Sequence, residues 1–152
     1  MRRIEASIHI KAPPEAVFDF VSDLRRIPEY VDIVLEIFDI MEGPTRVGTR
    51  YRERAKPGLV EQLQEWRCTE FERPHNQVYE GRSPQMHLLL HKQMEPEAGG
   101  TRYSQWIEFK MFPRFQPLGW LLDPLVARQM AREFKKITAG IKQIVEREQV
   151  VT

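Results

Sequence analysis

The stretch QPLGWLLDPLVARQMAREFKKITAGIKQIVEREQV, residues 116–150, decides the fold, because it holds a long apolar stripe at helical spacing. The stripe consists of Leu118, Leu122, Val126, Met130, Phe134, Ile137, Ile141 and Ile144. Arginine, lysine and glutamate occupy the opposite face. Asp123 and Pro124 are typical of an N-cap and a first helical residue, which predicts a helix of about 25 residues and roughly 37 Å. A helix of this length needs a large surface against which to bury its apolar face.

The chain upstream predicts strands that could supply this surface. Residues 3–11 alternate between apolar and polar, and two prolines then begin a short helix. A second short helix is predicted over residues 24–30, followed by a strand within residues 31–41. Two hairpins come next, turning at Pro57-Gly58 and at residues 96–100, with a short strand around residues 77–81 between them. These elements predict an α+β fold in which a curved antiparallel sheet of six to seven strands wraps the C-terminal helix.

Charged residues suggest a register for each hairpin, since opposite charges directly across a strand pair are stabilising. In the first hairpin, setting Arg54 opposite Glu61 pairs Glu53 with Gln62 and Tyr51 with Gln64. In the second, setting Glu95 opposite Arg102 predicts the inward pairs Met94 with Tyr103, Lys92 with Gln105, Leu90 with Ile107, Leu88 with Phe109 and Met86 with Met111.

Length and composition predict a single domain over residues 1–152. A net charge of +1 gives no reason to expect nucleic acid as a partner. The single cysteine, Cys68, excludes an intrachain disulfide and fits a reducing compartment. No stretch approaches the roughly 18 apolar residues of a membrane span, and no apolar signal core is seen at the N-terminus. We therefore expect a cytoplasmic protein with no transmembrane segment.

Residues 8–23, IHIKAPPEAVFDFVSD, resemble the opening of the START-like (SRPBCC) superfamily, particularly its polyketide cyclase/dehydrase branch. The segments GTRY at 48–51, EW at 65–66 and GTRY at 100–103 fall where later strands of that family would lie. The resemblance implies a helix-grip fold with a deep cavity between the sheet and the C-terminal helix. It also implies that the cavity holds a hydrophobic or aromatic small molecule such as a lipid, a quinone or a polyketide.

Aromatase/cyclases of this superfamily carry a serine and an arginine two residues apart after the strand tryptophan, and a tyrosine near the first long strand. In this chain Cys68 and Glu70 stand at the serine and arginine positions, and Val34 and Leu35 stand near the tyrosine position. The usual catalytic set is therefore not matched.

Binding of an apolar or aromatic small molecule is the leading functional hypothesis, because an apolar inner face carries a few convergent polar groups. The candidate ligand-binding residues are Tyr51, Gln64, Trp66, Tyr79, Leu88, Leu90, Tyr103, Gln105, Phe109, Phe112, Leu122 and Val126. Tyr79 and Tyr103 could offer hydroxyls to a ligand oxygen, and Trp66 and Phe109 could stack on a ring.

An alternative is a cyclase or dehydratase in which Glu53 acts as acid or base and Tyr51 or Tyr103 orients an oxygen. An inward carboxylate beside Tyr51 would have a raised pKa, whereas a position on the rim near the turn would leave Glu53 in solvent. Lys92 presents the same choice, between a buried amine and a side chain that extends out of a cavity mouth.

No cofactor and no metal site are expected. His87 and His91 would stand roughly 13 Å apart on a strand, on its outer face. That spacing is too wide for one ion with ligands at about 2 Å. The arginines of residues 46–54 predict a solvated sheet face rather than a nucleic-acid site.

The aromatic segment of residues 112–120 lies between the last predicted strand and the long helix. Phe112, Phe115 and Trp120 could form a lid over a cavity, a dimer contact or a surface that touches a membrane. A third hypothesis is therefore an interaction module that docks a protein through this loop, and the chain is expected to be a monomer or a weak homodimer.

Overall fold

The computed structural model describes residues 2–84, 86–111 and 124–151. The elements in these ranges are β1 (Arg2–Ile10), α1 (Pro14–Ser22), the 3-10 helix η1 (Leu24–Glu29), β2 (Val34–Phe38), β3 (Arg50–Ala55), β4 (Gln62–Glu72), β5 (Asn76–Arg82), β6 (Met86–Glu97), β7 (Gly100–Met111) and α2 (Pro124–Val151). The predicted order of one strand, two short helices, six strands and a long helix is confirmed. The second short helix is a 3-10 helix, which accommodates Pro28.

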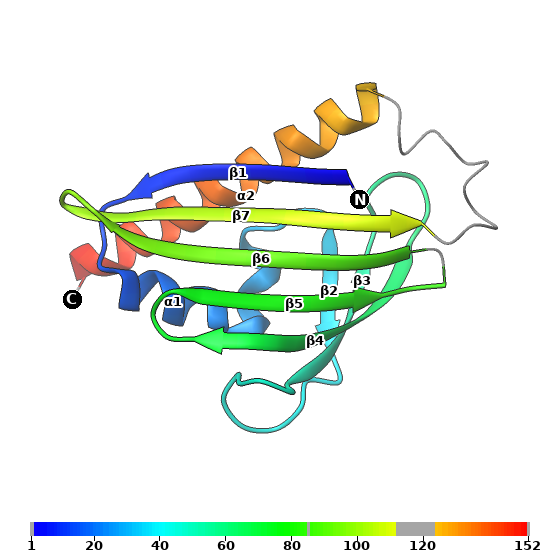
Figure 1. The fold of residues 1–152 in the computed structure, drawn as a ribbon, viewed down its shortest axis with the longest axis horizontal. Coiled ribbons are helices and arrows are strands. Elements are labelled where there is room, and N and C mark those ends of the chain that lie inside the picture. Colours follow the sequence, from blue (N-terminus) through cyan, green and yellow to red (C-terminus); the bar gives the residue numbers. More distant parts are fainter. Residues whose placement is uncertain (1, 85, 112–123, 152) are drawn as a thin grey trace.

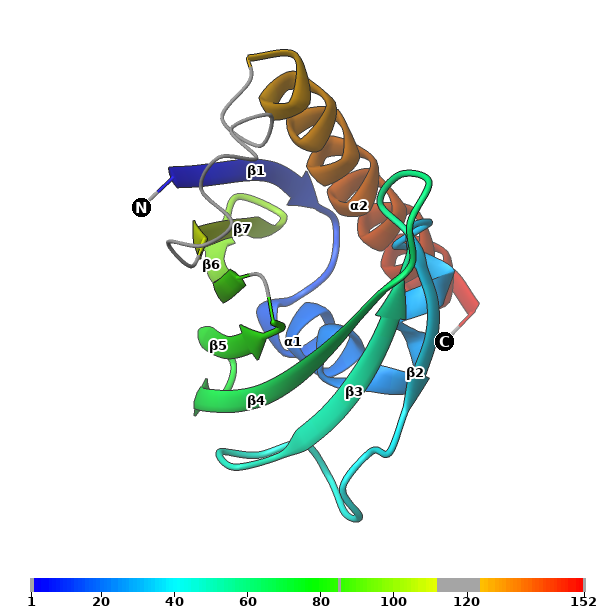
Figure 2. The ribbon, with the colours of Figure 1, turned by 90° about the vertical axis from the view of Figure 1, so that its right-hand side faces the viewer.

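The strands form one antiparallel sheet in the order β1-β7-β6-β5-β4-β3-β2. Most neighbours in the sheet are therefore neighbours in the chain, and only β1 joins a distant partner, β7 (Figure 1). Figure 2 shows the sheet curving into an arch, with α2 across its open side and α1 inside it. This arrangement confirms the predicted α+β helix-grip fold, and it turns one face of every strand toward the interior.

Helix α2 begins at Pro124, as predicted, and its buried residues include the stripe from Phe134 to Ile144. Leu118 and Leu122 lie outside the described residues, and the side chain of Val126 is not described. Near the C-terminal end, Lys142 Nζ donates to the carbonyl oxygen of His9 at 2.9 Å, and the backbone N–H of Lys11 donates to Glu146 at 2.8 Å. These contacts fix α2 against the end of β1.

Gly140 lets α2 approach Tyr30, directly after η1, closely. A Cβ at Gly140 would lie 3.2 Å from Tyr30 Cβ. The small residue therefore accommodates the turn that follows the 3-10 helix.

The predicted register of the β6–β7 hairpin is confirmed, including Lys92 opposite Gln105 and Leu88 opposite Phe109. The predicted β3–β4 register is wrong by two residues, because Tyr51 pairs with Trp66 and Glu53 pairs with Gln64. The ladder stops at Ala55 and Gln62, so the connection is longer than a tight turn at Pro57-Gly58. A shift of two residues leaves every side chain on its predicted face.

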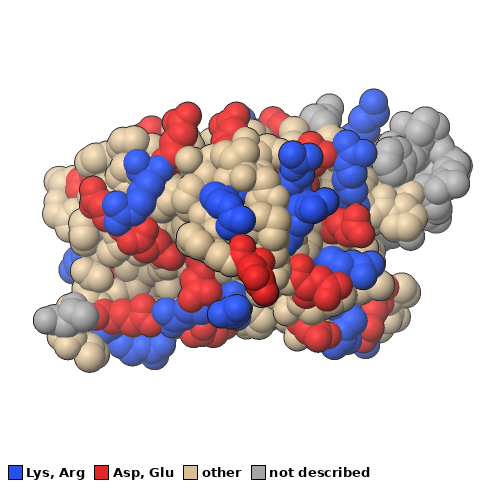
Figure 3. All heavy atoms as spheres, turned by 90° about the horizontal axis from the view of Figure 1, so that it is seen from below, with Lys and Arg blue, Asp and Glu red and all other residues tan. Residues whose placement is uncertain are grey.

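Outer-face charges of β3 pair with neighbouring acidic residues. Arg54 contacts Glu36 at 3.3 Å and Glu61 at 3.1 Å, and Arg52 lies 3.8 Å from Glu65. Figure 3 shows acidic and basic residues intermixed over one face of the molecule. No described helix is long and apolar enough to cross a membrane.

Candidate functional site

The inner face of the sheet gathers aromatic and polar side chains from five adjacent strands. They are Tyr51 and Glu53 from β3, Gln64, Trp66 and Cys68 from β4, Gln77 and Tyr79 from β5, Lys92 from β6, and Tyr103 and Gln105 from β7. All of these except Glu53 are buried, and Glu53 is half-buried. Polar residues are mostly exposed in folded proteins, so this cluster of buried polar groups is not explained by the fold alone.

Three rings form the aromatic part of this face. Tyr51 stacks on Trp66 with ring centroids 6.5 Å apart, and Tyr79 meets Tyr51 edge to face at 6.3 Å. The Trp66 indole lies over Gly81, where a Cβ would stand only 2.8 Å from it. Gly81 therefore provides the space that the indole occupies on the neighbouring strand.

Glu53 lies between the two predicted environments, because its side chain faces inward but is only half-buried. Burial raises the pKa of its carboxyl from 4.5 to about 7, while the Trp66 indole and the charge of Lys92 act in the opposite direction. The Trp66 N–H thus lies close to the carboxylate, but it falls short of a hydrogen bond, and Nε1 is a buried donor without a partner among the described residues. Glu53 is a group that can gain or lose a proton near neutral pH.

Lys92 is buried, with 6% of its surface exposed, so its side chain does not extend into solvent. Its Nζ lies 5.0 Å from the ring centroid of Tyr79, a cation–π contact. Burial lowers the pKa of this amine to about 8, and nearby Cys68 and Glu53 partly offset that effect. Within the described part of the chain, Lys92 has no hydrogen bond or ion pair.

Two predicted hydroxyl donors are already occupied. Tyr79 donates to Gln77 Oε1 at 2.7 Å, and Tyr103 donates to Gln105 Oε1 at 2.8 Å. Gln77 in turn donates to Ser22 Oγ at 2.7 Å, which joins β5 to α1. Tyr79 and Tyr103 therefore present rings rather than free donor hydroxyls to the interior.

Sequence reasoning missed two residues of the interior, Gln77 and Tyr30. Gln77 could have been found from its inward position opposite Lys92. Tyr30 follows η1, and its hydroxyl, like Trp66 Nε1, is a buried polar atom with no hydrogen-bond partner among the described residues. Nothing in the alternation of the strands indicates Tyr30, because it reaches the interior from a turn.

Apolar candidates on the inner face divide into two groups. Leu88 and Phe109 are buried, whereas the paired Leu90 and Ile107 are inward but only half-buried. Half-exposed apolar side chains on a concave face leave room for an apolar partner. Phe112 and Leu122, like the predicted lid of residues 112–120, lie outside the described residues.

The surroundings of His87, His91 and Cys68 do not favour metal binding or nucleophilic catalysis. His91 stacks on Trp106 at 4.9 Å on the outer face, and His87 lies 3.6 Å from Glu80. The described ranges contain no group of three or more residues that could hold a metal ion. Cys68 is fully buried, and burial raises the pKa of its thiol to about 11, so the nucleophilic thiolate is disfavoured.

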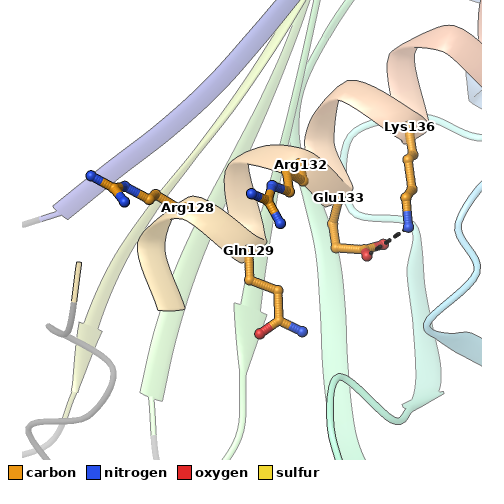
Figure 4. A pocket seen from close by; sticks show the side chains of 5 residues that line it. All are labelled: Arg128, Gln129, Arg132, Glu133 and Lys136. Atoms are coloured by element: carbon orange, nitrogen blue, oxygen red, sulfur yellow. Dashed lines mark hydrogen bonds and ion pairs between the residues drawn. The ribbon is translucent and has the colours of Figure 1, made fainter. Parts of the chain in front are cut away.

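A hollow of about 430 Å³ lies elsewhere, along α2 (Figure 4). Its lining consists of Arg128, Gln129, Arg132, Glu133 and Lys136. All five come from one helix and four are charged, with Lys136 and Glu133 paired at 3.3 Å. None of them belongs to the inner face of the sheet, so we place the candidate site at Glu53 and Lys92 and not in this hollow.

Comparisons with known proteins agree with this architecture. A family model described as polyketide cyclase / dehydrase and lipid transport matches residues 1–146. A search of curated proteins gave no significant match. The crystal structure of TTHA0849 from Thermus thermophilus has a TM-score of 0.73 at 23% identity, covering 95% of this chain and 97% of that one.

Two further structures extend the likeness in fold. The Zhui aromatase/cyclase from a Streptomyces species has a TM-score of 0.74 at 12% identity, with 95% of each chain covered. The structure of Ara h 8.0201 has a TM-score of 0.68 at 16% identity, covering 95% of this chain and 97% of that one. Since the family model spans nearly the whole sequence, this protein belongs to the polyketide cyclase/dehydrase and lipid transport family of the START-like superfamily.

Proposed function

We propose that this protein binds an apolar or aromatic small molecule between the inner face of the sheet and α2. The observation that carries the proposal is a pair of buried polar atoms in the interior, Trp66 Nε1 and the Tyr30 hydroxyl, that have no hydrogen-bond partner among the described residues. The buried Lys92 side chain makes no hydrogen bond or ion pair within those residues either. Buried polar groups in native proteins are almost always hydrogen-bonded, so unpaired ones clustered on a concave face favour a bound molecule that completes them.

The rest of the inner face favours an apolar body for that molecule. Tyr51, Trp66 and Tyr79 offer ring faces and edges, and the half-buried Leu90 and Ile107 offer aliphatic surface. Ligand sites are commonly lined by such side chains with a few polar groups that fix orientation. An aromatic ring system or a fused polyketide-like ring matches this mixture.

Binding can be tested with diphenylhexatriene, a neutral probe whose fluorescence rises in apolar surroundings. We expect a saturable rise with the wild-type protein. Leu90→Arg should abolish it, because the new charge would occupy the inner face. Leu89→Arg is the matched control, since Leu89 is the adjacent, half-buried residue on the outer face, opposite Glu108 and Glu80. An absent wild-type signal, or equal loss in both variants, would contradict the proposal.

A second candidate is acid–base catalysis on a polyketide-like substrate, and the position of Glu53 favours it. A carboxyl whose pKa is about 7 can remove a proton beside a carbonyl and return one to a departing hydroxyl. Tyr51 is the better placed partner, because Tyr103 already donates to Gln105. Glu53→Gln should then stop the dehydration of a β-hydroxy ketone without weakening its binding. Unchanged turnover in that variant would exclude Glu53 as the acid or base.

A further inference from the structure

We infer that the ligand of this site carries an acidic oxygen, as a carboxylate, enolate or phenolate, and that Lys92 is its counter-ion. The inference rests on the proposed binding function and names the chemical class of the ligand. It concerns the end of the ligand that faces Lys92 on β6. The rest of the ligand is the apolar body proposed above.

The first argument is the environment of the Lys92 ammonium group. The side chain is buried, and among the described residues its ammonium makes a cation–π contact with the Tyr79 ring and no hydrogen bond to an oxygen. A buried cation loses its hydration, and a ring face replaces only part of it. Such a charge is stabilised when an anionic oxygen comes within hydrogen-bond distance.

Glu53 does not fill that role. The two charges influence one another, but no ion pair within 4.0 Å joins them among the described residues. The other charged or titratable neighbours of Lys92 offer no anion near neutral pH either. The Cys68 thiol and the Tyr79 hydroxyl both have pKa values raised by burial, and that hydroxyl donates to Gln77.

The second argument is an excess of donors on the inner face. Trp66 Nε1 can only donate, and it has no hydrogen-bond partner among the described residues. Gln105, directly opposite Lys92, uses its amide oxygen to accept from Tyr103, which leaves its NH₂ group to donate. Together with the ammonium of Lys92, these groups favour a ligand rich in acceptor oxygens. Among the inner-face groups that the structure describes, a cationic ligand would meet one carboxylate, Glu53, against these three donors.

The test compares two ligands of the same shape, naphthoate and naphthamide, by isothermal titration calorimetry at pH 7. We expect the wild-type protein to bind naphthoate about tenfold more tightly, the range of one hydrogen bond to a charged group. Lys92→Met keeps the length of the side chain and removes its charge, so the two ligands should bind this variant equally. Lys110→Met, an exposed lysine on β7, is the control and should keep the wild-type preference.

Each outcome separates this inference from the function on which it rests. Failure of both ligands to bind the wild-type protein would overturn the proposed function together with the inference. Equal binding of naphthoate and naphthamide to the wild-type protein would overturn the inference alone. A preference for naphthoate that persists in Lys92→Met would also overturn it, because another group would then hold the anion. Circular dichroism of each variant confirms that the fold is retained.

Discussion

Glu53 on β3 and Lys92 on β6 are the charged residues of the candidate site. Alternation in β3 and β6 predicted that both face inward, and the structure agrees. Alternation does not report how deep a side chain lies. Burial of Lys92 depends on the curvature of the sheet, which brings β3, β4 and β5 around it. Curvature of this kind is a property of the assembled sheet and cannot be derived from one strand.

Stability should depend on pH through Glu53. Its pKa in the folded chain is about 7, against an ordinary 4.5, so the folded state binds more protons than the unfolded chain between these values. The Glu53 contribution to stability therefore falls as the pH rises from about 4.5 to about 7. Glu53→Gln removes this titration. The variant should be more stable than wild type at pH 8, by up to about 3 kcal/mol, with most of the difference gone at pH 4.

Urea unfolding of both proteins at the two pH values measures this difference. Glu65→Gln serves as the control, because Glu65 is exposed on the outer face of β4. A change in stability that is the same at pH 4 and pH 8 would contradict the assignment to Glu53.

Gly81 sets the position of the Trp66 indole. A methyl group at Gly81 would lie within 3 Å of the ring, so Gly81→Ala should displace the indole and cost about 1–3 kcal/mol of unfolding free energy. Gly58→Ala is the matched control, because a Cβ there meets nothing within 4 Å. Chemical denaturation measures both variants, and equal stability of the two would show that the indole yields without cost.

At the scale of elements, side-chain faces were easier to predict than strand pairing. The β6–β7 register followed from Glu95 and Arg102, because the turn between them is short. The β3–β4 register failed, since a longer connection lets Arg54 reach Glu61 without standing opposite it. A long arginine side chain can thus satisfy a charge pair from more than one register, so charge alone does not determine pairing.

Attachment of α2 to β1 depends on Glu146. This carboxylate accepts from the backbone of Lys11 and from Lys142 at 2.6 Å, and these contacts lower its pKa. Glu146→Ala should destabilise the protein by about 1 kcal/mol at pH 7. The difference should shrink as the pH falls through the lowered pKa, because a protonated Glu146 no longer supports these contacts. Thermal unfolding against Gln143→Ala, an exposed position on the same helix, is the measurement. An equal effect of both variants would exclude a specific role for Glu146.

For the whole molecule, the stripe of α2 and the alternation of the strands were sufficient to predict the architecture. The resemblance of residues 8–23 predicted the family, and the family model that matches residues 1–146 confirms it. The polar composition of the interior was predicted only in part, because Tyr30 enters it from a turn and Gln77 from a strand whose pairing was not predicted. Such contributions depend on tertiary packing and leave no periodic signal in the sequence.

We propose that the chain folds as one domain, which should unfold in one step. The seven strands share one sheet, and all ten elements contribute residues to one hydrophobic core cluster. We therefore expect thermal unfolding followed by far-ultraviolet circular dichroism and by tryptophan fluorescence to give coincident transitions. Two separated transitions would show that the chain contains independently folding parts.

The pairing of Tyr79 with Gln77 and of Tyr103 with Gln105 has a consequence for protein engineering. These hydrogen bonds hold each ring in place through a glutamine two residues away on the same strand. The charges at Lys92 and Glu53 are not part of either pair. In the proposed ligand site, exchanging those two side chains should therefore change ligand preference while the aromatic framework keeps its geometry.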